Sequence, residues 1–187
     1  MSPETRGQVR ESGTSVSVII RAARVADAPW LADLAERTFR ETYTAYNTPE
    51  DMERYVADHF APELQAAELS DPRFVTLVAE VEGRPAAYAQ LGHRPAPPGV
   101  TGAEPMEIVR FYVDRPWHGQ GLAQELMRAA AEYAQAAGAR TLWLGVWERN
   151  PRAIAFYRKS GFTEVGTQTF VLGRDHQRDL VLERPIP

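Results

Sequence analysis

A glycine turn between an expected strand and a long expected helix is the feature that most constrains this chain. Residues 107–113 are rich in strand-forming side chains, and the turn that follows reads His118-Gly119-Gln120-Gly121-Leu122-Ala123. Apolar residues then recur at helical spacing until Gly138 ends the pattern. A helix that begins on such a turn presents unpaired backbone N–H groups and the positive end of its dipole. The sequence therefore predicts an anion site, suited to a phosphate-bearing ligand, at the start of this helix.

Hydrophobic periodicity and turn signals predict about seven strands and about five helices along the chain. The expected strands cover residues 16–22, 74–80, 84–91, 107–113, 141–146, 162–171 and 177–183. The expected helices cover residues 27–43, a segment from 48, 62–69, 121–137 and 151–160. We predict one α/β domain over residues 16–187 with a mixed, mostly antiparallel twisted sheet. Residues 1–15 are polar and without pattern, which predicts a disordered tail.

Composition excludes several classes of protein. The 187 residues include no cysteine, which rules out a disulfide framework, a thiolate nucleophile and a Cys-ligated metal. The four histidines are scattered, so we expect no metal site. No run of residues is long and apolar enough to span a membrane, and the polar N-terminus does not resemble a signal peptide. We therefore expect a cytoplasmic protein without a membrane partner.

The distribution of charge is more informative than its total. A net charge of −4 argues against nucleic acid as a partner. Residues 36–71 carry nine acidic residues and three arginines, a net charge of −6. Residues 107–160 carry five acidic and eight basic residues, a net charge of +3. The first region suits a cationic partner, and the second suits an anionic one.

Two common phosphate-binding motifs do not fit the glycine turn. A nucleotide P-loop needs a lysine and a serine or threonine directly after its second glycine, where this chain has Leu122 and Ala123. A dinucleotide-binding fold needs a third glycine three residues after the second, where this chain has Gln124. The turn therefore predicts a different kind of phosphate-bearing ligand.

The stretch from residue 106 to residue 162 resembles the core of the GNAT N-acetyltransferase family. His118-x-x-Gly121-x-Ala123 has the spacing of the family's turn, with His118 standing where the family usually has Gln or Arg. Further residues at the family's spacing are Asn150, the helix over 153–157 and Gly161-Phe162. The resemblance implies a GNAT-like α/β fold, with residues 16–187 as a single N-acetyltransferase domain and acetyl-CoA as its co-substrate.

Three other segments are similar to bacterial spermidine/spermine acetyltransferases of the PaiA type. They are residues 47–52, 144–150 and 172–179, and with the core they extend the resemblance over roughly residues 20–183. Labels for the substrate of a subfamily transfer poorly between proteins, because function depends on the site and not on the fold.

The resemblance also implies how acetyl-CoA would be bound. The pantetheine and the thioester carbonyl would lie against Phe111-Tyr112-Val113, where the family's two central strands splay apart and leave backbone donors free. The pyrophosphate would bind the amides of Gly119, Gln120, Gly121, Leu122 and Ala123, with His118 beside them. Further contacts are implied for Asn150, Tyr157 and Lys159, although Lys159 could equally be a solvated cation at a helix end.

Acetyl transfer to a primary amine needs a proton acceptor, because only about one amine in a thousand is neutral at pH 7. The resemblance implies that Glu107 is this base, and the alternative is an exposed carboxylate at a strand end. Tyr157 would lie beside the sulfur, where it would either protonate the departing thiolate or only orient it. The alternative for Tyr157 is core packing.

The acceptor is inferred from the acidic helices that precede the core. Their carboxylates could hold the ammonium groups of a polyamine or could be a solvated face; they are Glu36, Glu41, Glu50, Asp51 and Glu53. Their aromatic residues could line a channel for a methylene chain or form core; they are Phe39, Tyr43, Tyr46 and Tyr55.

We therefore expect an acetyl-CoA-dependent N-acetyltransferase that acts on a primary amine of a small cationic acceptor, with a polyamine as one candidate. The amine would attack the thioester directly in a ternary complex. Two alternatives are open: acetylation of a protein lysine or N-terminus, and a non-catalytic acetyl-CoA-binding regulator. A monomer and a homodimer are both compatible with the sequence.

Overall fold

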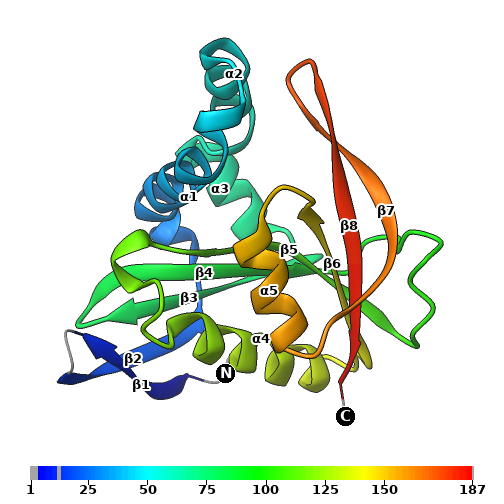
Figure 1. Cartoon of the computed structure of the whole chain (residues 1–187). Coiled ribbons are helices and arrows are strands. Elements are labelled where there is room, and N and C mark those ends of the chain that lie inside the picture. Colours follow the sequence, from blue (N-terminus) through cyan, green and yellow to red (C-terminus); the bar gives the residue numbers. More distant parts are fainter. Residues whose placement is uncertain (1–3, 12–13, 187) are drawn as a thin grey trace.

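The computed structural model describes residues 4–11 and 14–186. These residues fold into an eight-stranded sheet flanked by five α-helices (Figure 1). The strands are β1 (Thr5–Glu11), β2 (Thr14–Ala22), β3 (Phe74–Val81), β4 (Arg84–Gly92), β5 (Pro105–Val113), β6 (Thr141–Trp147), β7 (Thr163–Leu172) and β8 (Asp175–Pro185). The helices are α1 (Ala28–Tyr43), α2 (Pro49–His59), α3 (Pro62–Ser70), α4 (Leu122–Ala136) and α5 (Pro151–Lys159). Short 3-10 turns cover Val25–Asp27, Thr44–Tyr46 and Arg115–Trp117.

The strand order β1-β2-β3-β4-β5-β6-β8-β7 is antiparallel throughout, except where β5 and β6 run parallel. The expected mixed, mostly antiparallel α/β fold is therefore confirmed. The β3–β4 hairpin closes on Glu82 and Gly83, which both have positive φ (50° and 75°). Two such residues make the turn that matches the right-handed twist of the paired strands.

The helices divide between the two faces of the sheet and create two cores. Leu122 and Leu126 of α4 pack on one face together with Leu142 and Leu144 of β6. Phe39 of α1 belongs to the core on the other face, which α1 and α2 cover. The strands contribute apolar side chains to both cores, because neighbouring side chains of a strand point to opposite faces of the sheet.

The disordered tail expected for residues 1–15 is wrong for residues 5–11, 14 and 15, which lie in strands. Strand β1 pairs with β2 in an antiparallel register from Thr5↔Ile20 to Glu11↔Thr14. Its one strongly apolar side chain is Val9, which is 2% exposed. An edge strand needs only backbone pairing and one buried face, so it carries little hydrophobic signal. Residues 1–3, 12 and 13 lie outside the described residues.

Thr48 and Asp27 stand directly before α2 and α1, and only Thr48 caps the helix that follows it. The hydroxyl of Thr48 accepts a hydrogen bond from the Asp51 amide at 3.2 Å at the start of α2. Asp27 instead accepts hydrogen bonds from Arg21, at 2.7 Å, and from the Trp30 indole, at 3.2 Å. It therefore ties α1 to β2 and does not cap the first turn of the helix. Among the described residues, no helix has the length and apolarity that crossing a membrane requires.

Candidate active site

The site is created where the two parallel strands of the sheet separate. Strand β5 pairs with β6 only from Pro105↔Thr141 to Glu107↔Trp143. Beyond Glu107, β5 remains bonded to β4, with a bulge at Val109 that arises because Gln90 pairs with Arg110 and Leu91 pairs with Ile108. The edge of β5 that faces β6 thus presents backbone polar groups without a strand partner. This is the splay that the resemblance implies.

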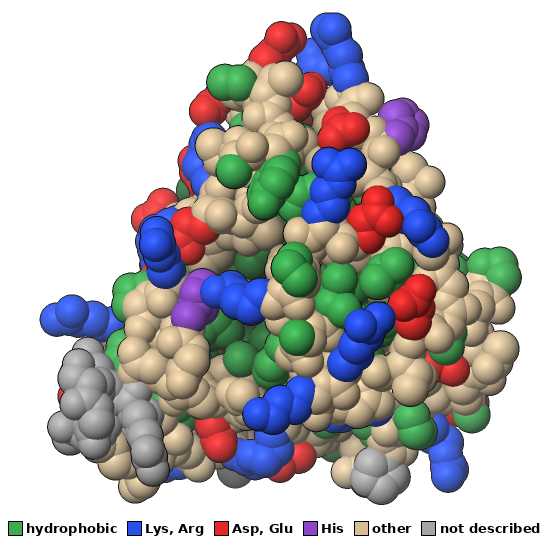
Figure 2. All heavy atoms as spheres, in the orientation of Figure 1, with side chains coloured by type: hydrophobic (Ala, Val, Ile, Leu, Met, Phe, Trp, Pro, Cys, Tyr) green, Lys and Arg blue, Asp and Glu red, His purple; other side chains and the backbone are tan. Residues whose placement is uncertain are grey.

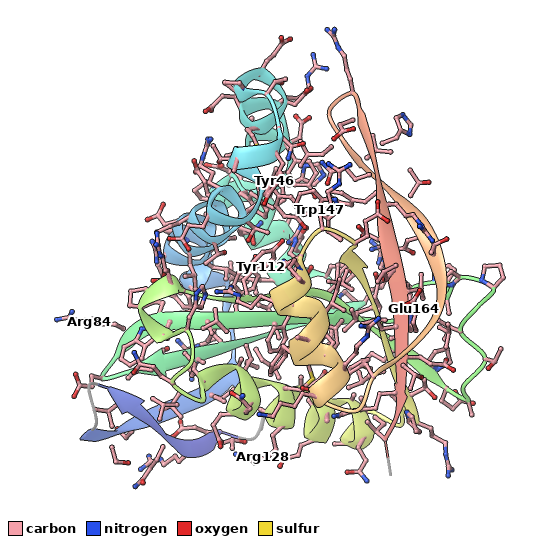
Figure 3. All side chains as sticks on the ribbon, viewed as in Figure 1. Tyr46, Arg84, Tyr112, Arg128, Trp147 and Glu164 are labelled. Atoms are coloured by element: carbon pink, nitrogen blue, oxygen red, sulfur yellow. The ribbon has the colours of Figure 1, made fainter. Side chains whose placement is uncertain are left out.

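A cavity of about 840 Å³ occupies the gap between β5 and β6. Its walls come from residues 107–112 of β5, residues 143 and 145–147 of β6, helices α1, α2 and α5, and the β7–β8 hairpin. Figure 2 shows hydrophobic side chains in a hollow of this face, with Lys and Arg side chains around it. Tyr112, Tyr46 and Trp147 come together between α1, α2 and α5, whereas Arg84, Arg128 and Glu164 lie at the periphery (Figure 3).

The glycine turn forms the N-terminus of α4. Gly119 and Gly121 have φ values of 77° and 89°, in the left-handed region that favours glycine. Within the part of the chain that the structure describes, the amides of Gly119, Gly121, Leu122 and Ala123 donate to no acceptor. Gln120 differs from its neighbours, because its amide points to the Trp117 carbonyl at 3.4 Å. Four free donors at the positive end of a 15-residue helix make a site for a phosphate group.

The side chain of His118 fastens this turn to β5. Its Nε2 lies 2.7 Å from the Val113 carbonyl, and its Nδ1 lies 2.5 Å from a guanidinium nitrogen of Arg152. The carbonyl requires the proton on Nε2, so Nδ1 accepts from Arg152. Arg152, on the first turn of α5, thus places an exposed cation beside the turn. Arg152 lies 34 residues after His118 in the sequence, and no sequence pattern indicates that the two side chains meet.

Glu107 lies on the wall of the cavity and is 7% exposed. Burial raises the pKa of its carboxyl, and the Arg94 guanidinium at 3.4 Å partly opposes this effect. Its Oε2 is buried without a hydrogen-bond partner among the described residues. The alternative of an exposed strand-end carboxylate is therefore wrong. A buried carboxylate with a raised pKa has the properties of a general base.

Tyr157 reaches the same cavity from α5 and is 7% exposed. Its ring packs edge-on against Phe111 of β5 at 6.2 Å and against Phe162 at 5.7 Å. Burial, with a smaller effect of Tyr112, raises the pKa of its phenol above the usual value near 10. The side chain therefore belongs both to the core and to the cavity, and it keeps its proton at neutral pH.

The other residues implied for the cofactor fall into two groups. Phe111, Tyr112 and Asn150 line the cavity, and the Asn150 Oδ1 also caps α5 by accepting from the Ala153 amide at 3.1 Å. Val113 and Lys159 do not line it. Lys159 lines a second cavity of about 570 Å³ between α4 and α5.

The acidic residues expected to hold the acceptor do not line the cavity. Glu36 and Glu53 both pair with Arg40, at 2.7 and 3.0 Å. Asp51 accepts from the Thr48 hydroxyl at 2.8 Å, and Glu50 lies 3.9 Å from Arg174. Glu41 also lies outside the lining. The net charge of the helices is thus mostly a surface property, as charge runs usually are.

The aromatic residues of the same helices do reach the cavity. Phe39, Tyr43 and Tyr55 line it, and Phe39 stacks on Tyr55 with ring centroids 4.5 Å apart. Tyr46 is 58% exposed and packs edge-on against Trp147 at 4.9 Å. The end of the cavity near α1 and α2 is therefore lined largely by ring faces.

Asp179 is a cavity residue that sequence reasoning missed. It is 8% exposed, and burial raises the pKa of its carboxyl to about 6. Its Oδ1 is buried without a hydrogen-bond partner among the described residues. Gln177, Asp179 and Val181 alternate along β8 on a buried face, and that burial follows from the place of β8 between β6 and β7.

Glu68 of α3, a third carboxylate, forms a half-buried network in the wall of the cavity. It forms an ion pair with Arg110 of β5 and accepts from the Gln90 amide at 2.9 Å. Burial alone would lower the pKa of Arg110, but the nearby Tyr88 and Glu68 outweigh it and raise that pKa. The network joins α3 to the sheet and leaves Glu68 with its charge compensated.

Comparison with known proteins places the chain among acetyltransferases. The model of the acetyltransferase (GNAT) family matches residues 32–162. An uncharacterised N-acetyltransferase of Mycobacterium tuberculosis is 35% identical over 163 residues, which cover 87% of this chain and 99% of the relative. One from Lactobacillus delbrueckii subsp. lactis is 30% identical over 160 residues, covering 86% and 92%.

Solved structures of acetyltransferases share the fold. The PaiA N-acetyltransferase of Thermoplasma acidophilum, solved in complex with coenzyme A, has a TM-score of 0.73 at 19% identity and covers 90% of this chain and 98% of its own. The ribosomal-protein-S18-alanine N-acetyltransferase of Escherichia coli has a TM-score of 0.66 at 19% identity, covering 90% and 94%. At these identities the likeness shows the fold alone, and the acceptor has to be argued from the cavity.

Proposed function

Because this chain belongs to the GNAT acetyltransferase family, we propose that it transfers the acetyl group of acetyl-CoA to a primary amine of a small cationic acceptor. The observation that carries the proposal is the cavity in the β5–β6 gap. Glu107 and Tyr157 both reach it. The free amides of the glycine turn begin the helix that follows β5.

The backbone supplies the contacts for the cofactor half of the reaction. The amides of Gly119, Gly121, Leu122 and Ala123 would bind the pyrophosphate, with the Arg152 guanidinium beside them. The unpaired edge of β5 would bind the pantetheine and donate to the thioester carbonyl, whose oxygen gains negative charge as the amine attacks. These donors are held by the sheet and the helix, so they need no reorganisation during the reaction.

Glu107 would accept the proton of the attacking amine, directly or through water. The nitrogen lone pair forms the new C–N bond at the carbonyl carbon, and the C–S bond breaks to release the thiolate. Burial raises the pKa of Glu107, which makes its carboxylate a stronger base than an exposed one. The proton lost by nitrogen is thus retained by the enzyme until solvent removes it.

Tyr157 would act on the sulfur as a hydrogen-bond donor. A thiol has a pKa of about 8.5, and the pKa of the buried Tyr157 phenol is raised above 10. Complete proton transfer from this phenol to the thiolate is therefore uphill. Donation of a hydrogen bond lowers the energy of the leaving thiolate without that transfer, so the positioning role is favoured over the acid role.

The shape of the cavity favours a small amine over a protein substrate. Helices α1 and α2 and the β7–β8 hairpin all contribute to its walls, and the rings of Phe39, Tyr43 and Tyr55 line it. A volume of about 840 Å³ falls in the range of small-molecule sites. A diamine or polyamine, with its apolar chain and cationic ends, suits such a lining.

The test is a thiol-release assay with acetyl-CoA and a panel of polyamines, monoamines, amino acids, aminoglycosides and peptides. We expect turnover with small cationic amines. If peptides are acetylated and small amines are not, the proposed acceptor is wrong. In parallel, acetyl-CoA at a hundred times its Kd should stabilise the fold by about 2.7 kcal/mol. A null thermal shift under those conditions would exclude acetyl-CoA as the co-substrate.

A further inference from the structure

Three carboxylates line the cavity, and they differ in how their charge is compensated. Glu68 pairs with Arg110 at 3.0 Å through its second oxygen. Glu107 lies 3.4 Å from Arg94. Asp179 has no cationic partner within the described ranges 4–11 and 14–186, and its Oδ1 has no hydrogen-bond donor there. A carboxylate more than nine-tenths buried without a partner is costly, so a ligand group is the natural source of compensation.

The surroundings of Asp179 suit a cation with an apolar body. Asp179 of β8 lies opposite Trp147 of β6 and opposite Gln168 of β7. Across the cavity, the ring of Tyr43 lies 5.4 Å from that of Trp147 and 6.3 Å from that of Phe170. Aromatic faces attract cations and pack well against methylene groups.

Gly145 leaves the space in which this carboxylate lies. A Cβ on Gly145 would stand 3.1 Å from the Asp179 Oδ2 and would overlap the Gln168 side-chain amide. Gly145 lines the cavity from β6, midway between Trp143, which is in register with Glu107, and Trp147, which is in register with Asp179. The Asp179 carboxylate and the Gln168 amide therefore share the space over the Gly145 backbone, and all three residues line the cavity.

Asp179 and Glu107 lie at different positions along β6. Glu107 is in register with Trp143, and Asp179 is in register with Trp147. Four residues of a strand extend over roughly 13 Å. One carboxylate can therefore take the proton of the reacting amine while the other holds a remote cationic group of the same molecule.

We propose that Asp179 is a specificity-determining residue that binds the second ammonium group of a diamine or polyamine acceptor. The inference rests on the proposed function and deepens it, because it predicts an acceptor with two amines joined by an alkyl chain. The rings of Tyr43, Trp147 and Phe170 would pack against that chain. Glu107 keeps the role of proton acceptor.

The test compares Asp179→Asn with the wild type on α,ω-diamines and on n-alkylamines of equal chain length. The control is Asp58→Asn, which removes the same charge from an exposed position of α2. We expect Asp179→Asn to raise KM for diamines roughly tenfold or more, as the loss of a hydrogen bond to a charged group does, and to leave KM for monoamines unchanged. Asp58→Asn should change neither.

Two outcomes would overturn the proposal. One is a decrease in kcat of Asp179→Asn that is equal for diamines and monoamines, which would make Asp179 a base and not a binding residue. The other is an unchanged KM for diamines. If the wild type acetylates no amine at all, the proposed function fails separately. Calorimetric titration of the diamine into the protein with coenzyme A present then still decides whether Asp179 binds it, since only Asp179→Asn should lose that heat.

Discussion

The two ends of the site are built in different ways. At the proposed cofactor end, six consecutive residues provide the glycine turn, and its donors are backbone amides. At the acceptor end, side chains from α1, α2, β6, β7 and β8 converge over a span from Phe39 to Asp179. A contiguous backbone site depends on glycine placement, which can be read from a sequence. A site assembled from distant side chains depends on the register of the sheet.

The two ends also differ in how selective they can be for a ligand. Backbone amides at a helix N-terminus bind any phosphate group of suitable shape, so the proposed cofactor end should tolerate His118 at an irregular position. Specificity for the acceptor needs charges and rings at defined places, and Asp179 and Glu107 supply two such charges. Substitutions should therefore affect side-chain chemistry at one end and backbone conformation at the other.

The largest effect is expected at Glu107. We predict that Glu107→Gln lowers kcat/KM for amines by about 10² to 10⁴, the range of general base catalysis, because the amide cannot accept the proton. The Kd for acetyl-CoA should not change. Steady-state kinetics and calorimetry measure the two quantities. Glu104→Gln is the control, since Glu104 is an exposed carboxylate three residues earlier. Full activity in Glu107→Gln would show that another group or a water chain is the base.

Asp179 gives the next largest effect, on stability. Its pKa is about 6 in the folded chain against 3.8 when exposed, so the folded state binds its proton more tightly. The protonated Asp179 carboxyl therefore stabilises the fold fully below about pH 4, and this stabilisation is lost as the pH rises through 6. A shift of about two units is worth about 3 kcal/mol, so Asp179→Asn should raise the unfolding free energy by up to that amount at pH 8.

The gain should disappear near pH 4, where the wild-type carboxyl is protonated. Chemical denaturation at both pH values measures it, and Asp58→Asn should show neither the gain nor its pH dependence. The charge of Asp179 raises the pKa values of three nearby phenols, those of Tyr43, Tyr55 and Tyr112. These phenols do not titrate between pH 4 and pH 8, so they do not contribute to this pH dependence. A gain of the same size at both pH values would mean that packing, and not charge, is responsible.

These cases show which features the sequence could predict. The helices and all strands but β1 follow from periodicity, since each buries a regular apolar stripe or face. The glycine turn and Tyr157 were found because they stand at fixed spacing in one continuous segment. Asp179 was missed because its burial depends on β8 lying between β6 and β7, an order that does not follow the chain.

The acidic helices show the opposite error. Glu36 and Glu53 carry the charge that suggested a cationic acceptor, but both turn toward Arg40 on the surface. Periodicity fixes which side of a helix faces the core, but it does not tell which carboxylates find an arginine. The acceptor's cationic character is instead supported by a carboxylate from the other end of the chain.

The smallest effect is expected at the glycine turn, and a matched glycine isolates it. Gly121 and Gly138 flank α4 with φ values of 89° and 90°, and a Cβ at either position would touch no atom within 4 Å. Alanine at either site should therefore cost about 1–2 kcal/mol of stability from backbone strain alone. Only Gly121→Ala should also weaken acetyl-CoA binding, by about tenfold, because it disturbs the amides that would bind the pyrophosphate. Denaturation and calorimetry on both variants measure this, and equal affinities would mean that the pyrophosphate does not lie on the turn.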